Sequence, residues 1–280
     1  MSRPVLLVMA AALLWGTTGT AAFWIGAEVS PIAIGAATMG IGGVILALVG
    51  GSSSLAVLRD GGTRVWAVLG ILGVVLYPLT FYWGMSQAGI ALGNLIALGL
   101  GPLIVALLEW GVDSSAPSRR WWFASGIALA GIALMSAAKV DLGGGRVSNV
   151  ALGVALAVTA GVAYGLYTYA FGRLIESGHS PRAVIGAMFG GASPILLLVP
   201  AVTGAGLFAS AAQVALVGYL VLGPMVLAYV AFSVALKTLR SSTVASVALL
   251  EPVVAGLLAI VLVGERLGPC LLYTSPSPRD

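Results

Sequence analysis

Glu251 and Pro252 are adjacent residues in the apolar segment VALLEPVVAGLLAIVLVGERL, which runs from Val247 to Leu267. An ionised carboxylate at membrane depth is costly, so Glu251 must face water, take up a proton or pair with a cation. Pro252 lacks a backbone N–H and disturbs the carbonyl of Ala248, which leaves an acceptor that water or a solute can use. The pair therefore predicts either a transport site that binds a solute or a proton, or a carboxylate that caps its own broken helix.

The segment around Glu251 is one of many long apolar runs. Hydrophobic residues make up 60% of the 280 residues and charged residues only 8%, whereas a soluble domain has about 25% charged residues. A helix of about 20 apolar residues crosses the hydrocarbon core, where open strands would leave backbone groups unpaired. We therefore expect an all-α polytopic membrane protein. The nine predicted helices are Pro4–Ala27, Pro31–Gly50, Val65–Gln87, Gly89–Trp110, Trp121–Ala138, Val150–Leu174, Pro181–Thr203, Ala211–Leu236 and Thr243–Val263.

The basic residues between the predicted helices indicate how the chain crosses the membrane. With a cytoplasmic N-terminus, the outer connections hold only Lys139, Arg146 and Arg266, and all other basic residues between the helices are cytoplasmic. The positive-inside rule favours this orientation, so we expect a multi-pass protein of the inner (cytoplasmic) membrane. The basic residues are scattered rather than clustered, so the formal charge of +4 predicts no nucleic-acid partner.

The chain also contains a weak internal repeat. A Gly-rich segment, Lys139–Asn149, follows the fifth predicted helix. An odd number of helices per half means that the second half enters the membrane from the opposite side, which is typical of secondary transporters. We expect Pro102 and Pro252 to break their helices at equivalent positions. The matching segments are Gly101–Leu108 with Glu251–Leu258, and Trp15-Gly16 with Tyr164-Gly165.

Three short motifs give the chain a resemblance to a known family. They are Leu14-Trp15-Gly16, Glu251-Pro252 and Gly264-Glu265-Arg266-Leu267. In this order and spacing they resemble the EamA-type exporters of the drug/metabolite transporter superfamily. The resemblance implies a ten-helix fold built as an inverted repeat of two five-helix bundles, of which nine helices are present. Residues 1–140 would form the first repeat and residues 141–269 the second.

The end of the chain departs from that pattern. The resemblance implies a tenth helix after Leu267, but residues 270–280 read CLLYTSPSPRD and are too short to cross a membrane. The string resembles the translation of a sequencing adapter. We therefore expect residues 270–280 to be a non-native, adapter-derived tail, and the second repeat to lack its last helix.

Several aromatic and polar residues are candidates for the wall of a solute site around Glu251. The resemblance implies a central cavity formed by the first, third, fourth, sixth, eighth and ninth helices. Each candidate has a structural alternative, since Trp and Tyr also form interfacial belts or pack between helices, and Asn can bond helix to helix. The predicted substrate-binding residues are Glu251, Trp15, Tyr82, Asn94, Tyr164 and Tyr229. Outside this site, Glu109 is expected to extend toward Arg119 or Arg120 near the end of its helix.

These features predict a secondary transporter that exports small metabolites, such as amino acids or related compounds, by alternating access. The expected partners are a small-molecule solute, the lipid bilayer and, if Glu251 carries one, a proton. No phosphate-binding loop of an ATPase is present. The single Cys and the single His, His179, predict neither a metal site nor a cofactor, and no nucleophile–base pair predicts an enzyme. The alternatives are a channel or non-transporting scaffold, and an intramembrane enzyme.

Overall fold

The computed structural model describes residues 3–26, 28–88, 90–140, 149–258 and 261–262. The predicted turn Gly264–Leu267 and the predicted tail, residues 270–280, lie outside this part. Within it, every element is helical and no strand occurs, which confirms the all-α prediction. The helices are α1 (Arg3–Gly16), α2 (Thr18–Ile25), α3 (Pro31–Gly50), α4 (Ser52–Arg59), α5 (Arg64–Ala88), α6 (Ile90–Asp113), α7 (Arg119–Val140), α8 (Val150–Glu176), α9 (Pro181–Thr203), α10 (Ala211–Leu220), the π-helical η1 (Val221–Leu227), α11 (Ala228–Leu236), α12 (Ser241–Ala248) and α13 (Leu250–Leu258).

Most of these helices are membrane spans by length and composition. Eight segments of the described residues, each a single helix or a run of two or three consecutive helices, are long and apolar enough to cross a membrane. They coincide with eight of the nine predicted spans. The fifth predicted span, Trp121–Ala138, coincides with α7, whose side chains from residue 131 onward lie outside the described part. The short helix α4 is not a span and carries the chain from α3 toward α5.

The helix ends follow local sequence chemistry. Pro31 and Pro181 begin α3 and α9, where the missing N–H of proline costs nothing. Asn149 caps α8 by accepting a hydrogen bond from the backbone N–H of Leu152. Ser210 begins α10 with a complete capping box. These signals fix the residues at which the helices begin, and these residues agree with the starts of the predicted apolar spans.

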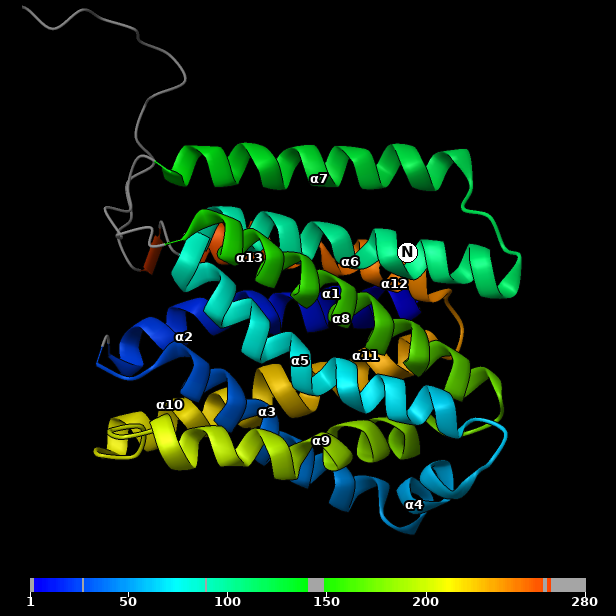
Figure 1. Cartoon of the computed structure of the whole chain (residues 1–280), viewed down its shortest axis with the longest axis horizontal. Helices are drawn as coiled ribbons and strands as arrows, with labels where there is room; N and C mark the ends of the chain where they lie inside the picture. The colour runs from blue at the N-terminus through cyan, green and yellow to red at the C-terminus, as the bar shows by residue number, and fades with distance from the viewer. Residues whose placement is uncertain (1–2, 27, 89, 141–148, 259–260, 263–280) are drawn as a thin grey trace, which may run out of the picture.

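The long helices run side by side along one direction in Figure 1, with connections at both ends of the bundle. The most extensive contact joins α3 to α9, and α8 packs along both α5 and α6. In the mirrored arrangement, α1 packs against α11 and against the pair α12 and α13. Each half of the chain thus contacts the other through equivalent helices, as an inverted repeat requires. Helix α7 lies at the edge of the bundle (Figure 1) and contacts α6, α12 and α13.

Two glycines make the mirrored contacts close. A Cβ atom on Gly16 of α1 would lie 2.6 Å from Cβ of Val254 and 3.1 Å from the carbonyl oxygen of Glu251. A Cβ atom on Gly165 of α8 would lie 2.6 Å from Cβ of Ile104 and 3.0 Å from the carbonyl oxygen of Gly101. Gly16 and Gly165 are equivalent positions of the two halves, and each contacts the equivalent segment of the other half. In both places only glycine, which has no side chain, lets the two helices approach so closely.

The two halves differ at their aligned prolines. Helix α12 ends at Ala248 and α13 begins at Leu250, so the ninth span is interrupted immediately before Glu251 and Pro252, as predicted. The predicted break at Pro102 is wrong, because α6 runs without interruption from Ile90 to Asp113. A proline removes one backbone donor, but neighbouring helices can hold a membrane helix together across that position.

Replacing Gly16 with Ala tests the close approach of α1 to the broken helix. The new methyl group would overlap Val254, so we expect a loss of about 1–3 kcal/mol of stability, the range for an overpacked site. The measurement is the thermal unfolding midpoint of the purified protein in detergent. Gly19→Ala in α2 is the matched control, because nothing lies within 4 Å of its Cβ position. Equal midpoints for the two variants would contradict the prediction.

Candidate functional site

Glu251 lies in the first turn of α13, directly after the interruption at Leu249. Its side chain is set deep among the helices, yet part of its surface stays uncovered. Among the described residues it makes no ion pair and no hydrogen bond, so the interpretation that it caps its own helix by hydrogen bonding finds no support there. The positive end of the α13 dipole favours a negative charge at this position.

Four tyrosines lie within electrostatic range of this carboxylate. Glu251 is close enough to interact electrostatically with Tyr77, Tyr82, Tyr164 and Tyr229. They come from α5, α8 and α11 and therefore from both halves of the chain. The structure thus brings together three predicted site residues and adds Tyr77, which sequence reasoning missed. The signal for Tyr77 was its position beside Pro78 in the same span.

The aromatic rings continue away from Glu251 as a connected cluster. The ring of Trp15 lies 5.0 Å from that of Tyr229 and the ring of Tyr164 lies 5.6 Å from that of Tyr77, measured between centroids. The hydroxyls of Tyr167 and Tyr229 are 3.0 Å apart and fully inside the bundle. Tyr167 was not predicted as a site residue, although it follows Tyr164 at helical spacing. The predicted Trp15, Tyr164 and Tyr229 therefore lie in one aromatic core.

Trp15 has a further structural bond. Its indole N–H donates to the backbone carbonyl of Pro224 at 2.8 Å. Pro224 lies within the π-helical segment η1 of the eighth span. Such π-helical turns occur often at functional sites. Trp15 thus links the first span of one half to the irregular turn of the other. The indole N–H is the only hydrogen-bond donor of its side chain, and this link uses it.

Asn94 is not joined to this cluster. It lies on α6, seven positions before Gly101, and among the described residues its side chain has no hydrogen-bond partner. Tyr82 does belong to the cluster, because its ring contacts Phe81 at 5.3 Å and lies directly against Gly35. Of the six predicted binding residues, Asn94 is therefore the one that the structure does not bring to Glu251.

A second group of charges occupies one end of the bundle. Glu109 is buried and accepts hydrogen bonds from Arg240 Nη2 at 2.8 Å, from the Ser242 backbone N–H at 2.9 Å and from the Ser242 hydroxyl at 2.6 Å. The prediction that Glu109 extends toward Arg119 or Arg120 is wrong. The carboxylate instead caps the N-terminus of α12, where freed N–H groups and the helix dipole favour an anion.

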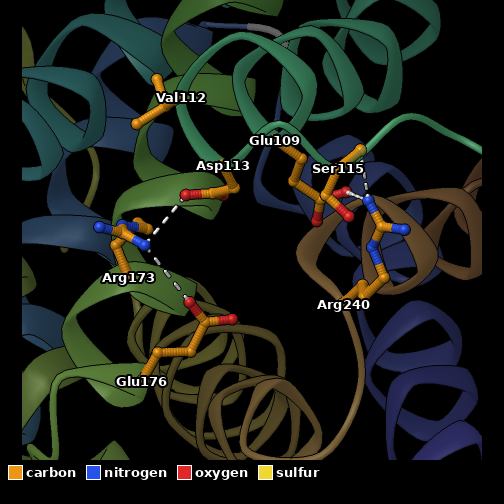
Figure 2. A pocket seen from close by; sticks show the side chains of 7 residues that line it. All are labelled: Glu109, Val112, Asp113, Ser115, Arg173, Glu176 and Arg240. Atoms are coloured by element: carbon orange, nitrogen blue, oxygen red, sulfur yellow. Dashed lines mark hydrogen bonds and ion pairs between the residues drawn. The ribbon is translucent and has the colours of Figure 1, made fainter.

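Asp113 makes the second link at this end. Its carboxylate accepts from Arg173 Nη1 at 2.9 Å and from the Tyr169 hydroxyl at 2.9 Å. Both links join α6 of the first half to elements of the second half. They flank a pocket of about 460 Å³. Figure 2 shows the residues that line it, which are Glu109, Val112, Asp113, Ser115, Arg173, Glu176 and Arg240. We call this group of residues the charged mouth.

Asp60 and His179 connect two further loops at the same end. The Asp60 carboxylate lies 3.0 Å from His179 Nε2 and accepts hydrogen bonds from the Thr63 hydroxyl and the Gly62 N–H, both at 3.0 Å. The Thr63 and Gly62 bonds, and then His179, lower the pKa of Asp60 below its ordinary value of 3.8. His179 is therefore a partner in a link between loops.

Glu109→Gln tests the buried cap of α12. The neutral amide cannot accept three hydrogen bonds from Arg240 and Ser242, so we expect a loss of about 1.5–3 kcal/mol, the range for hydrogen bonds to a charged group. The thermal midpoint in detergent measures it. Glu176→Gln is the control, because Glu176 is 65% exposed and lies 3.8 Å from Arg173, where a pair contributes about 0–1 kcal/mol. An equal loss in the two variants would show that the cap is unimportant.

The lowered pKa of Asp60 predicts a pH-dependent contribution to stability. Because the folded state prefers the charged carboxylate, this contribution is present above the unfolded pKa and is lost as pH falls through the folded pKa, below 3.8. Wild type should therefore unfold at a higher temperature than Asp60→Asn near pH 6, and the difference should shrink below pH 3.8. Thermal scans over this pH range measure it. A difference that is constant with pH would contradict the assignment.

Three comparisons relate this geometry to known proteins. The sequence model of the EamA-like transporter family matches residues 2–137 and 151–272. The protein described as "Uncharacterized transporter YwfM" of Bacillus subtilis (strain 168) is 30% identical over an alignment of 281 residues, which covers 94% of this chain and 87% of that protein. A solved structure titled "Crystal structure of protein" shares the fold with a TM-score of 0.77 at 24% identity, covering 97% of this chain and 92% of the other.

These matches agree with the architecture described above. Both matched segments cover the spans that face each other across the bundle, and the eight apolar helices make the chain a multi-pass membrane protein. The predicted resemblance is confirmed by the family match and by the named transporter. The chain belongs to the EamA-like transporter family.

Proposed function

We propose that this protein is a secondary transporter of the cytoplasmic membrane that exports a small metabolite by alternating access of its two halves. The observation that carries the proposal is the position of Glu251. It is a carboxylate at a helix interruption, without a basic partner among the described residues, and it lies where aromatic side chains of both halves meet. Broken helices at the interface of inverted repeats are where transporters of this architecture bind their solutes.

The composition of the cluster supports a solute site between the two halves. Trp15, Tyr77 and Tyr82 come from α1 and α5, whereas Tyr164 and Tyr229 come from α8 and α11. A relative movement of the halves changes the distances between these two sets while each set stays on its own helices. Apolar walls with a few placed polar groups are typical of sites for small molecules.

The charged mouth supports the second element of the proposal, a reversible closure. The links Glu109–Arg240 and Asp113–Arg173 join the two halves at one end. Arg240 and Arg173 are partly exposed, with side-chain exposures of 45% and 37%. The carboxylates are less exposed, at 7% for Glu109 and 24% for Asp113. The guanidinium groups regain water when a pair separates, which lowers the cost of opening, whereas the buried Glu109 carboxylate raises it above that of a surface pair. Both links are formed in this structure, so they join the two halves at this end.

Glu251 also fits a role in coupling. A carboxylate that alternates between a proton and a solute ties the movement of one to that of the other. The helices packed against α13 are α1, α2 and α7. Their basic residues, Arg3, Arg119, Arg120 and Lys139, lie near helix ends, and the titratable groups that face Glu251 are the four tyrosines. No basic side chain in the described part therefore neutralises Glu251, which leaves that role to a proton or a solute.

A channel or a non-transporting scaffold is the alternative class, and counterflow separates it from a carrier. Proteoliposomes preloaded with an unlabelled solute should transiently concentrate the same labelled solute if the protein is a carrier. The solute is found first by testing a panel of labelled amino acids and other metabolites. A labelled solute that only equilibrates indicates a channel, and its failure to enter at all indicates a scaffold.

Glu251→Gln tests the role of the carboxylate. If Glu251 binds the proton or the solute, transport should fall by at least about tenfold, equivalent to about 1.4 kcal/mol of lost interaction, and its dependence on pH should flatten. The measurement is initial efflux from proteoliposomes between pH 5.5 and about 8, the range that spans ordinary cellular pH. Glu28→Gln, at an exposed loop position, is the control. Unchanged efflux in Glu251→Gln at every pH would refute coupling through this residue but not facilitated export.

A further inference from the structure

We propose that the seam between α6, α7 and α8 binds one anionic phospholipid, with its phosphate at Arg119 and Arg120 and one acyl chain in an apolar groove. The proposal goes beyond the proposed function and does not depend on it, because it requires only that the chain lies in a bilayer. Three features support it: the chemistry of the groove, the apolar stripes that lead to it, and the two arginines at its entrance.

The groove lies on the outside of the bundle, on α6 between α7 and α8. It encloses about 500 Å³, and its lining includes Gly99 and Leu103 of α6, Leu129 of α7 and Val158 of α8. Apart from Gly99, the lining side chains are half-buried or exposed. Glycine brings the helices together here, because a Cβ atom at Gly99 would lie 2.9 Å from Cδ2 of Leu129. Every lining residue is apolar, so a hydrocarbon chain is the occupant that suits the groove.

Exposed apolar residues connect the groove to one end of the bundle. On α6, Leu107 and Trp110 follow Leu103 at spacings of four and three residues, so the three lie on one face of the helix. On α7, Trp122 precedes Leu129 by about two turns. Leu107, Trp110 and Trp122 are 51%, 56% and 47% exposed. Tryptophans near a span end mark the level of the headgroups, so both stripes lead from that level into the groove.

The depth of the groove suits an acyl chain of the adjacent leaflet. At a rise of about 1.5 Å per residue, Leu103 lies about 10 Å and Ile96 about 21 Å from Trp110 along α6. Both residues line the groove. One leaflet fills about 15 Å, half of the hydrocarbon core. A chain that starts at the level of Trp110 therefore enters the groove with its second half and ends within it.

Arg119 and Arg120 supply the positive charge at the entrance. They begin α7 directly after the loop that follows α6. Both are exposed, and neither forms an ion pair in the part of the chain that the structure describes. The carboxylates of α6, Glu109 and Asp113, bind other arginines in the charged mouth (Figure 2). The charges of Arg119 and Arg120 are therefore available to a phosphate.

The headgroup, and not the chain, must decide which lipid binds. An acyl chain leaves one hydrocarbon environment for another when it enters the groove, so its burial gives little preference between lipids. Basic residues beside a span attract anionic lipids, and basic pockets between spans on the cytoplasmic side bind their headgroups. The positive-inside rule predicts that Arg119 and Arg120 lie on that side. A lipid with a net negative headgroup is therefore preferred over a zwitterionic one with the same chains.

Native mass spectrometry of the full chain in detergent micelles tests this preference. The probes are dioleoyl phosphatidylglycerol and dioleoyl phosphatidylcholine, which share their chains and differ in headgroup charge. We expect saturable binding of one phosphatidylglycerol, with a Kd at least about fivefold below that of phosphatidylcholine, the factor for one basic side chain. Equal affinities would overturn the proposal. A dimer that takes up no lipid would also overturn it, because a second copy would then cover the groove.

Paired variants locate the headgroup. Arg119→Gln combined with Arg120→Gln should bring the affinity for phosphatidylglycerol to that for phosphatidylcholine. Arg59→Gln combined with Arg64→Gln is the matched control, because it removes the same charge from exposed positions at the end of α4 and the start of α5. Helices α4 and α7 lie at opposite edges of the bundle (Figure 1), so this control should keep the preference. An equal loss in both double variants would indicate a general effect of net charge and overturn the site.

Competition on the unaltered protein distinguishes a lipid from a soluble anion. Inorganic phosphate in large excess should not displace phosphatidylglycerol, because it lacks the chain that the groove holds. Its displacement by phosphate would assign Arg119 and Arg120 to a soluble anion and overturn the lipid site. This measurement needs no variant, so it is independent of any misfolding that a substitution causes.

A photoreactive phosphatidylglycerol with a diazirine in one acyl chain locates that chain. Its cross-links to the unaltered protein, mapped by peptide mass spectrometry, should concentrate on residues 95–103 of α6 and on Leu129 of α7. Leu198 and Val202 of α9 are 66% and 85% exposed and serve as the internal reference for lipids that bind anywhere on the bundle. Equal labelling of the groove and of these two residues would show an unspecific lipid contact and overturn the proposal.

Discussion

The need to satisfy every backbone hydrogen bond inside hydrocarbon is the constraint on which this structure depends. It makes each span a helix and makes any interruption costly unless protein or water covers it. The chain interrupts its ninth span at Leu249, between α12 and α13. That interruption lies in the interior, against α1, where Gly16 admits the backbone of the broken helix. The interrupted helix that carries Glu251 can pack this closely against α1 only because Gly16 has no side chain.

The inverted repeat explains why the structure is nearly symmetric in packing and asymmetric in chemistry. Gly16 meets Glu251 and Val254 as Gly165 meets Gly101 and Ile104, so the two halves share one way of packing a helix against its neighbour. The carboxylate occurs in one half only. Its counterpart Gly101 lies directly against the ring of Tyr164 instead. Symmetric packing thus builds the frame, and a single difference in sequence, Glu251 against Gly101, places the charge in one half only.

The charged mouth and the aromatic cluster divide the polar chemistry of the bundle between two places. At the mouth, carboxylates and guanidinium groups neutralise each other, as in Glu109 with Arg240 and Asp113 with Arg173. Glu251 makes no such pair among the described residues, and the titratable groups within its electrostatic range are tyrosines. Paired charges suit a contact that holds two halves together. An unpaired carboxylate suits a place where a mobile charge binds.

The sequence by itself determined the membrane class, the helices and the family, because hydrocarbon permits few alternatives to apolar helices. The spans Pro31–Gly50, Pro181–Thr203 and Ala211–Leu236 match the observed helices or helix groups residue for residue, since proline, serine and glycine mark their ends. The resemblance to the exporter family made Trp15, Tyr82, Tyr164 and Tyr229 candidates for the wall of a site around Glu251. Only the tertiary structure decided that Tyr77 and Tyr167 join them and that Asn94 does not. It also decided that Glu109 binds Arg240 and Ser242, that Trp15 bonds to Pro224, and that α6 continues through Pro102.

Apolarity and helix-end signals act within a segment and can be read along the chain. The partners of a side chain depend on how helices distant in sequence rotate and pack against each other, and in a chain where 60% of residues are hydrophobic many such packings share the same pattern.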